Sequence, residues 1–164
     1  MHRFLLPILM LVLSSTSEAR EMFGRIGLGY NAQFAQASAT DPGAPGVSFK
    51  YGFNPRTMLE LIGGYRSGSE SSGVAALKLM QTMHSESYLN FYFLVGFGVV
   101  SLSSSSGTEL ISGFGTEFFL PGLESIGISF EAGLDFENYS ASSNSYILKT
   151  FGASFLNAGM HYYF

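Results

Sequence analysis

The chain has 164 residues, which favours a single domain, and it carries 46% apolar but only 12% charged residues at a formal net charge of −4. This composition excludes an intrinsically disordered chain, and the absence of Cys excludes a disulfide scaffold, a thiolate metal site and a Cys-anchored lipoprotein. A nucleic-acid partner is not expected, because no basic cluster offsets the negative net charge.

The N-terminal residues have the layout of a secretory signal peptide. A basic start at Arg3 is followed by an apolar run from Phe4 to Leu13, and Ser17-Glu18-Ala19 resembles a small-x-small cleavage site. The apolar run is too short for a membrane-spanning helix, which needs roughly 20 residues. We therefore predict a signal peptide at 1–19 and a mature domain at 20–164. The alternative is an uncleaved N-terminal anchor or a core helix.

The rest of the chain alternates large apolar residues with Gly or polar residues at a period of two, which is the pattern of β-strands. The eight predicted strands cover residues 22–31, 47–53, 59–66, 75–80, 89–99, 109–118, 126–137 and 156–164. Tight turns are predicted at 54–57, 84–87 and 121–125, and longer loops at 33–45, 67–73, 103–108 and 138–145. Short and long connections that alternate predict an all-β, eight-stranded antiparallel up-and-down barrel.

The two faces of these strands differ in charge and volume. All eleven charged residues of the predicted strands fall on the Gly-rich face if the last strand extends upstream to Lys149. An eight-stranded barrel is just wide enough inside for side chains to fill, so the large apolar residues of the other face would overpack it. A Lys or Arg that faces lipid at the midplane costs roughly 2–4 kcal/mol. We therefore expect the apolar face outside, in a membrane, and a polar, filled lumen.

Buried charges need partners, so we expect the inward charges to pair across the lumen. The predicted lumen charge network consists of Arg25, Lys50, Glu60, Arg66, Lys78, Glu117, Glu131 and Asp135.

The C-terminus carries aromatic residues on one strand face, with Met160 and Tyr162 followed by the final residue, Phe164. This end resembles the assembly signal of bacterial outer-membrane proteins. Residues 20–164 as a whole are similar to the small eight-stranded outer-membrane barrels of the OmpA-barrel, OmpX/Ail and OmpW kind. The resemblance implies a bacterial outer-membrane location, contact with outer-membrane lipid, and the barrel-assembly machinery as a partner during biogenesis.

Few residues have the spacing of catalytic groups. His84, Ser85 and Glu86 are adjacent in one predicted turn and cannot easily present a nucleophile, a base and an orienting acid together. His161 falls on the predicted lumen face. We interpret it as a hydrogen-bonded residue that helps to fill the lumen, and not as a base or a ligand. We therefore predict that the protein is not an enzyme.

One acidic group has the donor chemistry of a hard-cation site. Glu131, Asp135 and Glu137 share one strand face. Same-face neighbours on a strand lie roughly 7 Å apart, so other elements would have to complete a metal shell. The preferred interpretation is the acidic half of a salt-bridge network, with no metal and no cofactor.

Three functions remain open. The leading hypothesis is a structural or surface-interaction protein of the outer membrane, which meets an unidentified surface partner through its longer loops. The second is a narrow gated pore with a charged lumen. The third is a soluble periplasmic lipocalin-like carrier, which would have its apolar face inside.

Overall fold

The computed structural model describes residues 21–32, 46–67, 71–102, 105–140, 144–150 and 156–164. The predicted signal peptide at 1–19 and the predicted loop at 33–45 lie outside these residues. The described strands are β1 (Ile26–Asn31), β2 (Gly46–Asn54), β3 (Thr57–Arg66), β4 (Ser72–Glu86), β5 (Leu89–Leu102), β6 (Ser106–Leu120), β7 (Leu123–Ser140), β8 (Asn144–Thr150) and β9 (Asn157–Tyr163). Among the described residues, no helix is long and apolar enough to cross a bilayer.

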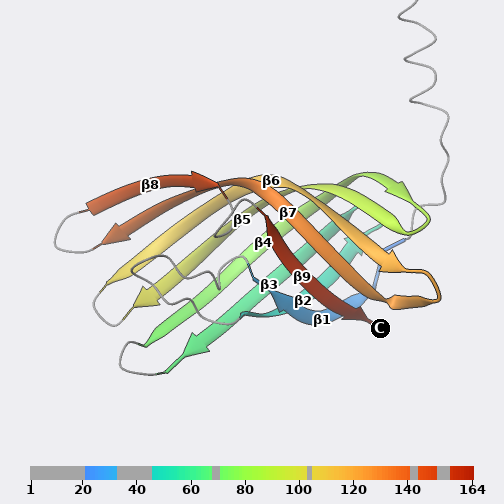
Figure 1. Ribbon diagram of the computed structural model, residues 1–164, viewed down its shortest axis with the longest axis horizontal. Coiled ribbons are helices and arrows are strands. Elements are labelled where there is room, and N and C mark those ends of the chain that lie inside the picture. The colour runs from blue at the N-terminus through green and yellow to red at the C-terminus, as the bar shows by residue number, and fades with distance from the viewer. Residues whose placement is uncertain (1–20, 33–45, 68–70, 103–104, 141–143, 151–155) are drawn as a thin grey trace, which may run out of the picture.

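The strands form one closed antiparallel barrel (Figure 1). Consecutive strands pair from β1 to β7. The last strand, β9, pairs with both β7 and β1 and so closes the sheet into a barrel. Both β8 and β9 pair with β7, so they are two parts of the eighth strand of the barrel. The predicted eight-stranded barrel is confirmed, although its last strand was predicted to start at Leu156 and the strand pairing along β7 begins earlier, at Asn144.

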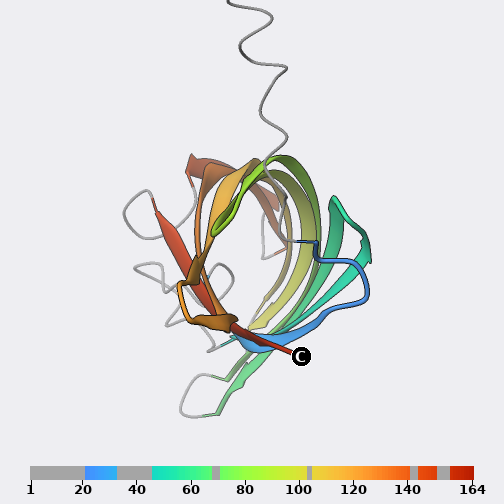
Figure 2. The same ribbon diagram turned by 90° about the vertical axis from the view of Figure 1, so that its right-hand side faces the viewer.

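The strand register shows how the barrel closes. A path of directly opposed residues leaves β6 at Phe119, crosses β7 at Gly127 and β9 at His161, and continues through β1 to β5. It returns to β6 at Glu109, ten residues from its start. This stagger tilts the strands against the barrel axis, as closure of a small barrel requires. Figure 2 shows the strands arranged in a ring around that axis.

The connections differ between the two ends, which we call the turn side and the loop side. On the turn side, two residues join each pair of strands: Pro55 and Arg56, Ser87 and Tyr88, and Pro121 and Gly122. The predicted turn at 84–87 is therefore shifted, because β4 keeps its pairing with β5 up to Glu86. On the loop side, β4, β6 and β7 reach into the predicted loops, since strand pairing continues there without apolar alternation.

The apolar face of the strands lies outside, as predicted. Adjacent residues of β5 show the difference: Leu94 is fully buried, whereas Val95 is 39% exposed. The lumen is polar, as predicted, and inward apolar side chains also pack between the charges. They are Met58, Ile62, Val74, Ala76, Met80, Tyr92, Leu94, Val100, Ile111, Phe119 and Tyr163. An interior this narrow excludes bulk water, so apolar side chains can fill it beside paired charges.

Closure depends on a close backbone approach between β1 and β9. A Cβ atom added to Gly29 would lie 1.9 Å from the Met160 carbonyl oxygen, whereas one added to Gly63 would meet no atom within 4 Å. We expect Gly29→Ala to lower the free energy of unfolding by about 1–3 kcal/mol, the usual cost of overpacking, and Gly63→Ala to change it little. Urea unfolding of both variants in detergent tests this, and equal stabilities would contradict the close backbone approach at Gly29.

Candidate functional site

The lumen holds a chain of charges carried by three neighbouring strands. Lys50 on β2 lies directly opposite Glu60 on β3, and Glu60 lies directly opposite Lys78 on β4. All three side chains are fully buried. They alternate in sign across the sheet, the arrangement in which cross-strand charge pairs are favourable.

Both lysines reach across the lumen to the opposite wall. The Lys78 ammonium donates to the two carboxylate oxygens of Glu131 on β7, at 2.8 and 2.7 Å, while it also lies 3.0 Å from Glu60 Oε2. The Lys50 ammonium donates to Glu117 Oε1 on β6 at 3.0 Å. These ion pairs tie β2 and β4 to β6 and β7 through the middle of the barrel. We call these five residues the lumen network: Lys50, Glu60, Lys78, Glu117 and Glu131.

Neutral side chains donate to the carboxylates of the lumen network. The Tyr163 hydroxyl donates to Glu117 at 2.7 Å and the Tyr92 hydroxyl donates to Glu131 at 2.9 Å. Asn157 Nδ2 donates to Glu131 at 2.8 Å, Asn31 Nδ2 donates to Glu60 at 3.0 Å, and the Ser48 hydroxyl also donates to Glu60. A buried ion pair is stable when such bonds satisfy its remaining oxygens. These donors were not predicted from the sequence, although each sits at an inward position of its strand.

Glycine makes room for the long lysine that spans the lumen. A Cβ atom at Gly96, directly opposite Lys78, would lie 2.7 Å from Lys78 Cγ. The Gly-rich face predicted from the sequence therefore accommodates the charged side chains beside it.

His161 lies beside the lumen network as a hydrogen-bonded residue. Its Nε2 is 2.8 Å from Ser48 Oγ and 3.4 Å from Glu60 Oε1, and its Nδ1 is 4.0 Å from Glu117 Oε1. A serine, a histidine and a glutamate are thus adjacent, but the Ser48 side chain is fully buried. Nucleophilic catalysis needs a serine that a substrate can reach.

Three predicted members of the network lie elsewhere. Arg25 precedes β1 and places its guanidinium carbon 5.5 Å from the centroid of the Tyr163 ring. Arg66 is exposed at the loop-side end of β3, because the predicted inward position there lies at the rim. Asp135 is buried but belongs to a second cluster. On the turn side, exposed His84 and Glu86 lie 3.6 Å apart, and no described neighbour makes them a catalytic set.

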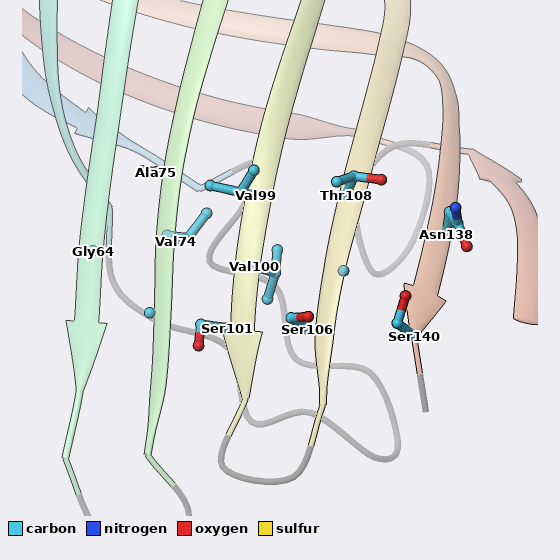
Figure 3. Close-up of a pocket in the computed structure, with 12 residues that line it drawn as sticks. Gly64, Val74, Ala75, Val99, Val100, Ser101, Ser106, Thr108, Asn138 and Ser140 are labelled. Atoms are coloured by element: carbon cyan, nitrogen blue, oxygen red, sulfur yellow. The ribbon is translucent and has the colours of Figure 1, made fainter. Parts of the chain in front are cut away.

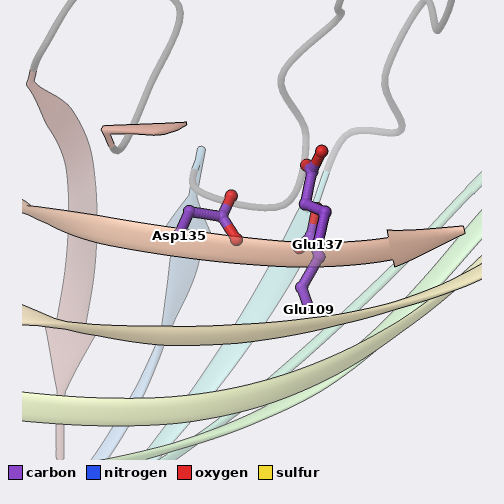
Figure 4. A group of neighbouring side chains, drawn as sticks. All are labelled: Glu109, Asp135 and Glu137. Carbon is purple, nitrogen blue, oxygen red and sulfur yellow. The ribbon is translucent and has the colours of Figure 1, made fainter. Parts of the chain in front are cut away.

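The second cluster, which we call the rim cluster, consists of Glu109, Asp135, Glu137 and Lys149. Glu109 on β6 lies directly opposite Glu137 on β7, and Asp135 lies directly opposite Lys149 on β8. The Lys149 ammonium contacts Glu137 and lies 3.5 Å from Asp135 Oδ2. Figure 4 shows the three carboxyl groups gathered beside β7. Glu131 was predicted to lie with Asp135 and Glu137, but it pairs with Lys78 instead.

A cavity of about 500 Å³ lies among the loop-side ends of five strands, β3 to β7 (Figure 3). Its lining is small and uncharged: Gly64, Gly73, Val74, Ala75, Val99, Val100, Ser101, Ser106, Gly107, Thr108, Asn138 and Ser140. This composition offers no acid, base or cation among the described lining residues.

Comparison with known proteins identifies similar folds. No protein-family model and no curated protein sequence matches the chain. The N-terminal β-barrel domain of Pseudomonas aeruginosa OprF superposes with a TM-score of 0.54 at 15% identity, over 85% of this chain and 96% of that one. The outer membrane protein Ail of Yersinia pestis gives a TM-score of 0.42 at 18% identity, over 85% of this chain and 97% of that one. The chain therefore shares the β-barrel fold of the OprF domain.

Proposed function

We propose that the protein is an integral barrel of the bacterial outer membrane, which acts as a structural anchor and meets partners through its loop-side connections. One observation carries this proposal: the outer surface of the barrel is apolar. The described outward positions of β1, β2, β5, β6 and β9 hold no charged side chain, and Leu110, Phe114 and Met160 are each at least half exposed. Water would make such a surface aggregate, whereas lipid is its natural solvent.

The closed strand pairing of β1 to β7 supports the same location. Every strand from β1 to β7 has a partner on both sides, so the sheet presents no open edge along these strands. A bilayer core tolerates β-structure only in this closed form, because unpaired backbone groups find no water there. The third hypothesis, a soluble carrier, requires the apolar face inside and disagrees with the observed orientation.

The packed lumen favours an anchor over a catalyst. The ion pairs of Lys50 and Lys78 cross the barrel, and Leu94 and Ile111 fill the space beside them. The serine and histidine that come together here are sealed inside this packing. We therefore propose a role that rests on the surface of the molecule and not on chemistry in its lumen.

The C-terminal strand has the features of an assembly signal. The side chains of Met160, Tyr162 and Phe164 are all exposed on the outer face, and the Tyr162 and Phe164 rings meet edge to face at 5.0 Å. The Phe164 amide donates to the Ile26 carbonyl at 2.9 Å and so joins the end of the C-terminal strand to β1. We propose that the barrel-assembly machinery recognises this strand. Deletion of Phe164 should reduce the folded barrel in membranes but leave refolding in detergent largely intact, and equal losses in both would contradict the recognition.

Gel mobility tests the barrel anchor directly. The mature chain, refolded in detergent, should migrate differently before and after boiling, because a closed barrel resists unfolding by SDS until it is heated. A urea-unfolded sample serves as the control and should show no shift. Refolding to a soluble monomer without detergent, together with no mobility shift, would contradict the proposal.

A narrow gated pore is the second candidate, and the position of Lys78 favours it. This one ammonium lies within 3.0 Å of carboxylates on opposite walls, so it obstructs the lumen together with the Lys50–Glu117 ion pair. Planar-bilayer recordings separate the two functions. A stable conductance that changes on charge reversal at Lys78 or Glu131 would support a pore, and a silent wild-type barrel would support the anchor.

A further inference from the structure

We propose that the rim cluster is a site for a calcium-like divalent cation, held by Glu109, Asp135 and Glu137. The three carboxylates come from two neighbouring strands and each is buried. One oxygen from each residue lies within 4.8 Å of the others. Two oxygens bound to the same Ca²⁺ at about 2.4 Å are at most about 4.8 Å apart, so the three oxygens already fit around one ion.

Acidic groups outnumber basic groups in the rim cluster. Glu109 and Glu137 are directly opposed across β6 and β7, a position in which like charges are destabilising. Lys149 is the cation that contacts this group among the described residues, so three carboxylates face one ammonium. The lumen network differs, because two lysines accompany its three carboxylates.

A buried oxygen without a partner points to a missing ligand. Asp135 is only 6% exposed, yet its Oδ1 accepts no hydrogen bond within the described part of the chain. Its other oxygen, Oδ2, is the one nearest to Lys149. A buried carboxylate oxygen that is left unsatisfied costs free energy, and a bound cation would remove that cost.

Lys149 shows where positive charge is accommodated. Its ammonium contacts Asp135 and Glu137, while its side chain remains 40% exposed and can extend into water. Without a bound ion, the Lys149 ammonium therefore supplies positive charge to the cluster. When the ion is present, the ammonium competes with it for the same carboxylates. The three carboxyl groups lie on β6 and β7, whereas Lys149 lies on β8. Cation binding at the loop-side rim would therefore replace the contacts of the Lys149 ammonium with these carboxylates by contacts of the ion.

Calcium titration of variants tests this exchange. The refolded barrel is freed of metal with a chelator in a non-ionic detergent, and Ca²⁺ binding is followed by calorimetry and by the midpoint of thermal unfolding. We expect Ca²⁺ to raise the midpoint of the wild-type protein, and Asp135→Asn to abolish that rise. Lys149→Met should be less stable than wild type without Ca²⁺ and should bind Ca²⁺ at least tenfold more tightly, because the competing ammonium is gone.

Lys78→Met is the matched control, since it removes a buried lysine from the lumen network. Calcium should not restore its stability, because no open coordination site is created there. Glu109→Gln provides a second ligand variant should Asp135→Asn refold poorly. Equal responses to Ca²⁺ in wild type and both ligand variants would overturn the proposal. So would a cluster whose stability depends on pH but not on Ca²⁺, because a shared proton would then balance the carboxylates.

Discussion

Replacement of Lys78 by Met is expected to lower the free energy of unfolding by about 3–5 kcal/mol, the usual result of removing one partner from a buried ion pair. Met preserves most of the stem that packs against Gly96, so the change isolates the loss of charge. The ammonium forms ion pairs with both Glu60 and Glu131, and its removal leaves both carboxylates buried without that charge. Urea unfolding of the variant in detergent measures the effect.

Two controls show whether charge is the cause. Lys78→Met combined with Glu131→Gln should recover part of the lost stability, because it also removes one of the uncompensated charges. Arg66→Met should stay within about 0.5 kcal/mol of wild type, since Arg66 is exposed at the rim. A Lys78→Met barrel as stable as the Arg66→Met barrel would mean that the ion pairs across the lumen contribute little.

Replacement of Leu79 by Arg is expected to cost about 2–4 kcal/mol when the barrel is folded in a bilayer. Leu79 is the middle residue of β4 and its side chain is 44% exposed on the outer face. If lipid covers that face, this position lies near the midplane, where a guanidinium is most costly. Reversible unfolding from vesicles gives the difference in free energy.

The position of the arginine along the strand supplies the control. Tyr65 is also exposed on the outer face, but it lies one residue from the loop-side end of β3. There the cost should fall to about 0–1 kcal/mol, because the arginine reaches the interface. Small and equal effects for Leu79→Arg and Tyr65→Arg would show that water and not lipid surrounds the barrel.

Period-two alternation predicted the strands and divided their residues between two faces, and charge placement and lumen volume then predicted which face lies outside. On β5 these arguments together give the inward positions of Tyr92 and Leu94 and the outward position of Val95. The same pattern placed Lys50, Glu60, Lys78, Glu117 and Glu131 in the lumen, where the structure brings them together. Alternation is informative because one face of the strand must be apolar and the other must not.

The pairing of charges could not be predicted in this way. Which residues meet across the lumen depends on the stagger between strands, and alternation does not specify it. Asp135 is on the inward face of β7, as alternation predicts, but its position along the strand places it at the rim beside Lys149. Alternation also predicts an inward position for Arg66, yet this residue is exposed beyond the packed interior. Strand ends on the loop side were predicted too short, because pairing there continues through Ser and Gly residues without an apolar signal.

Quenching of tryptophan fluorescence tests the central claim, that the apolar face of the strands contacts lipid and the lumen face does not. The chain has no Trp, so a single introduced residue reports without background. Phe93 and Tyr92 are neighbours on β5 that point to opposite faces, which makes Phe93→Trp and Tyr92→Trp a matched pair. In vesicles whose acyl chains carry bromine, Phe93→Trp fluorescence should be strongly quenched and Tyr92→Trp fluorescence should not. Quenching of Tyr92→Trp alone, or of neither variant, would contradict the orientation of the barrel wall.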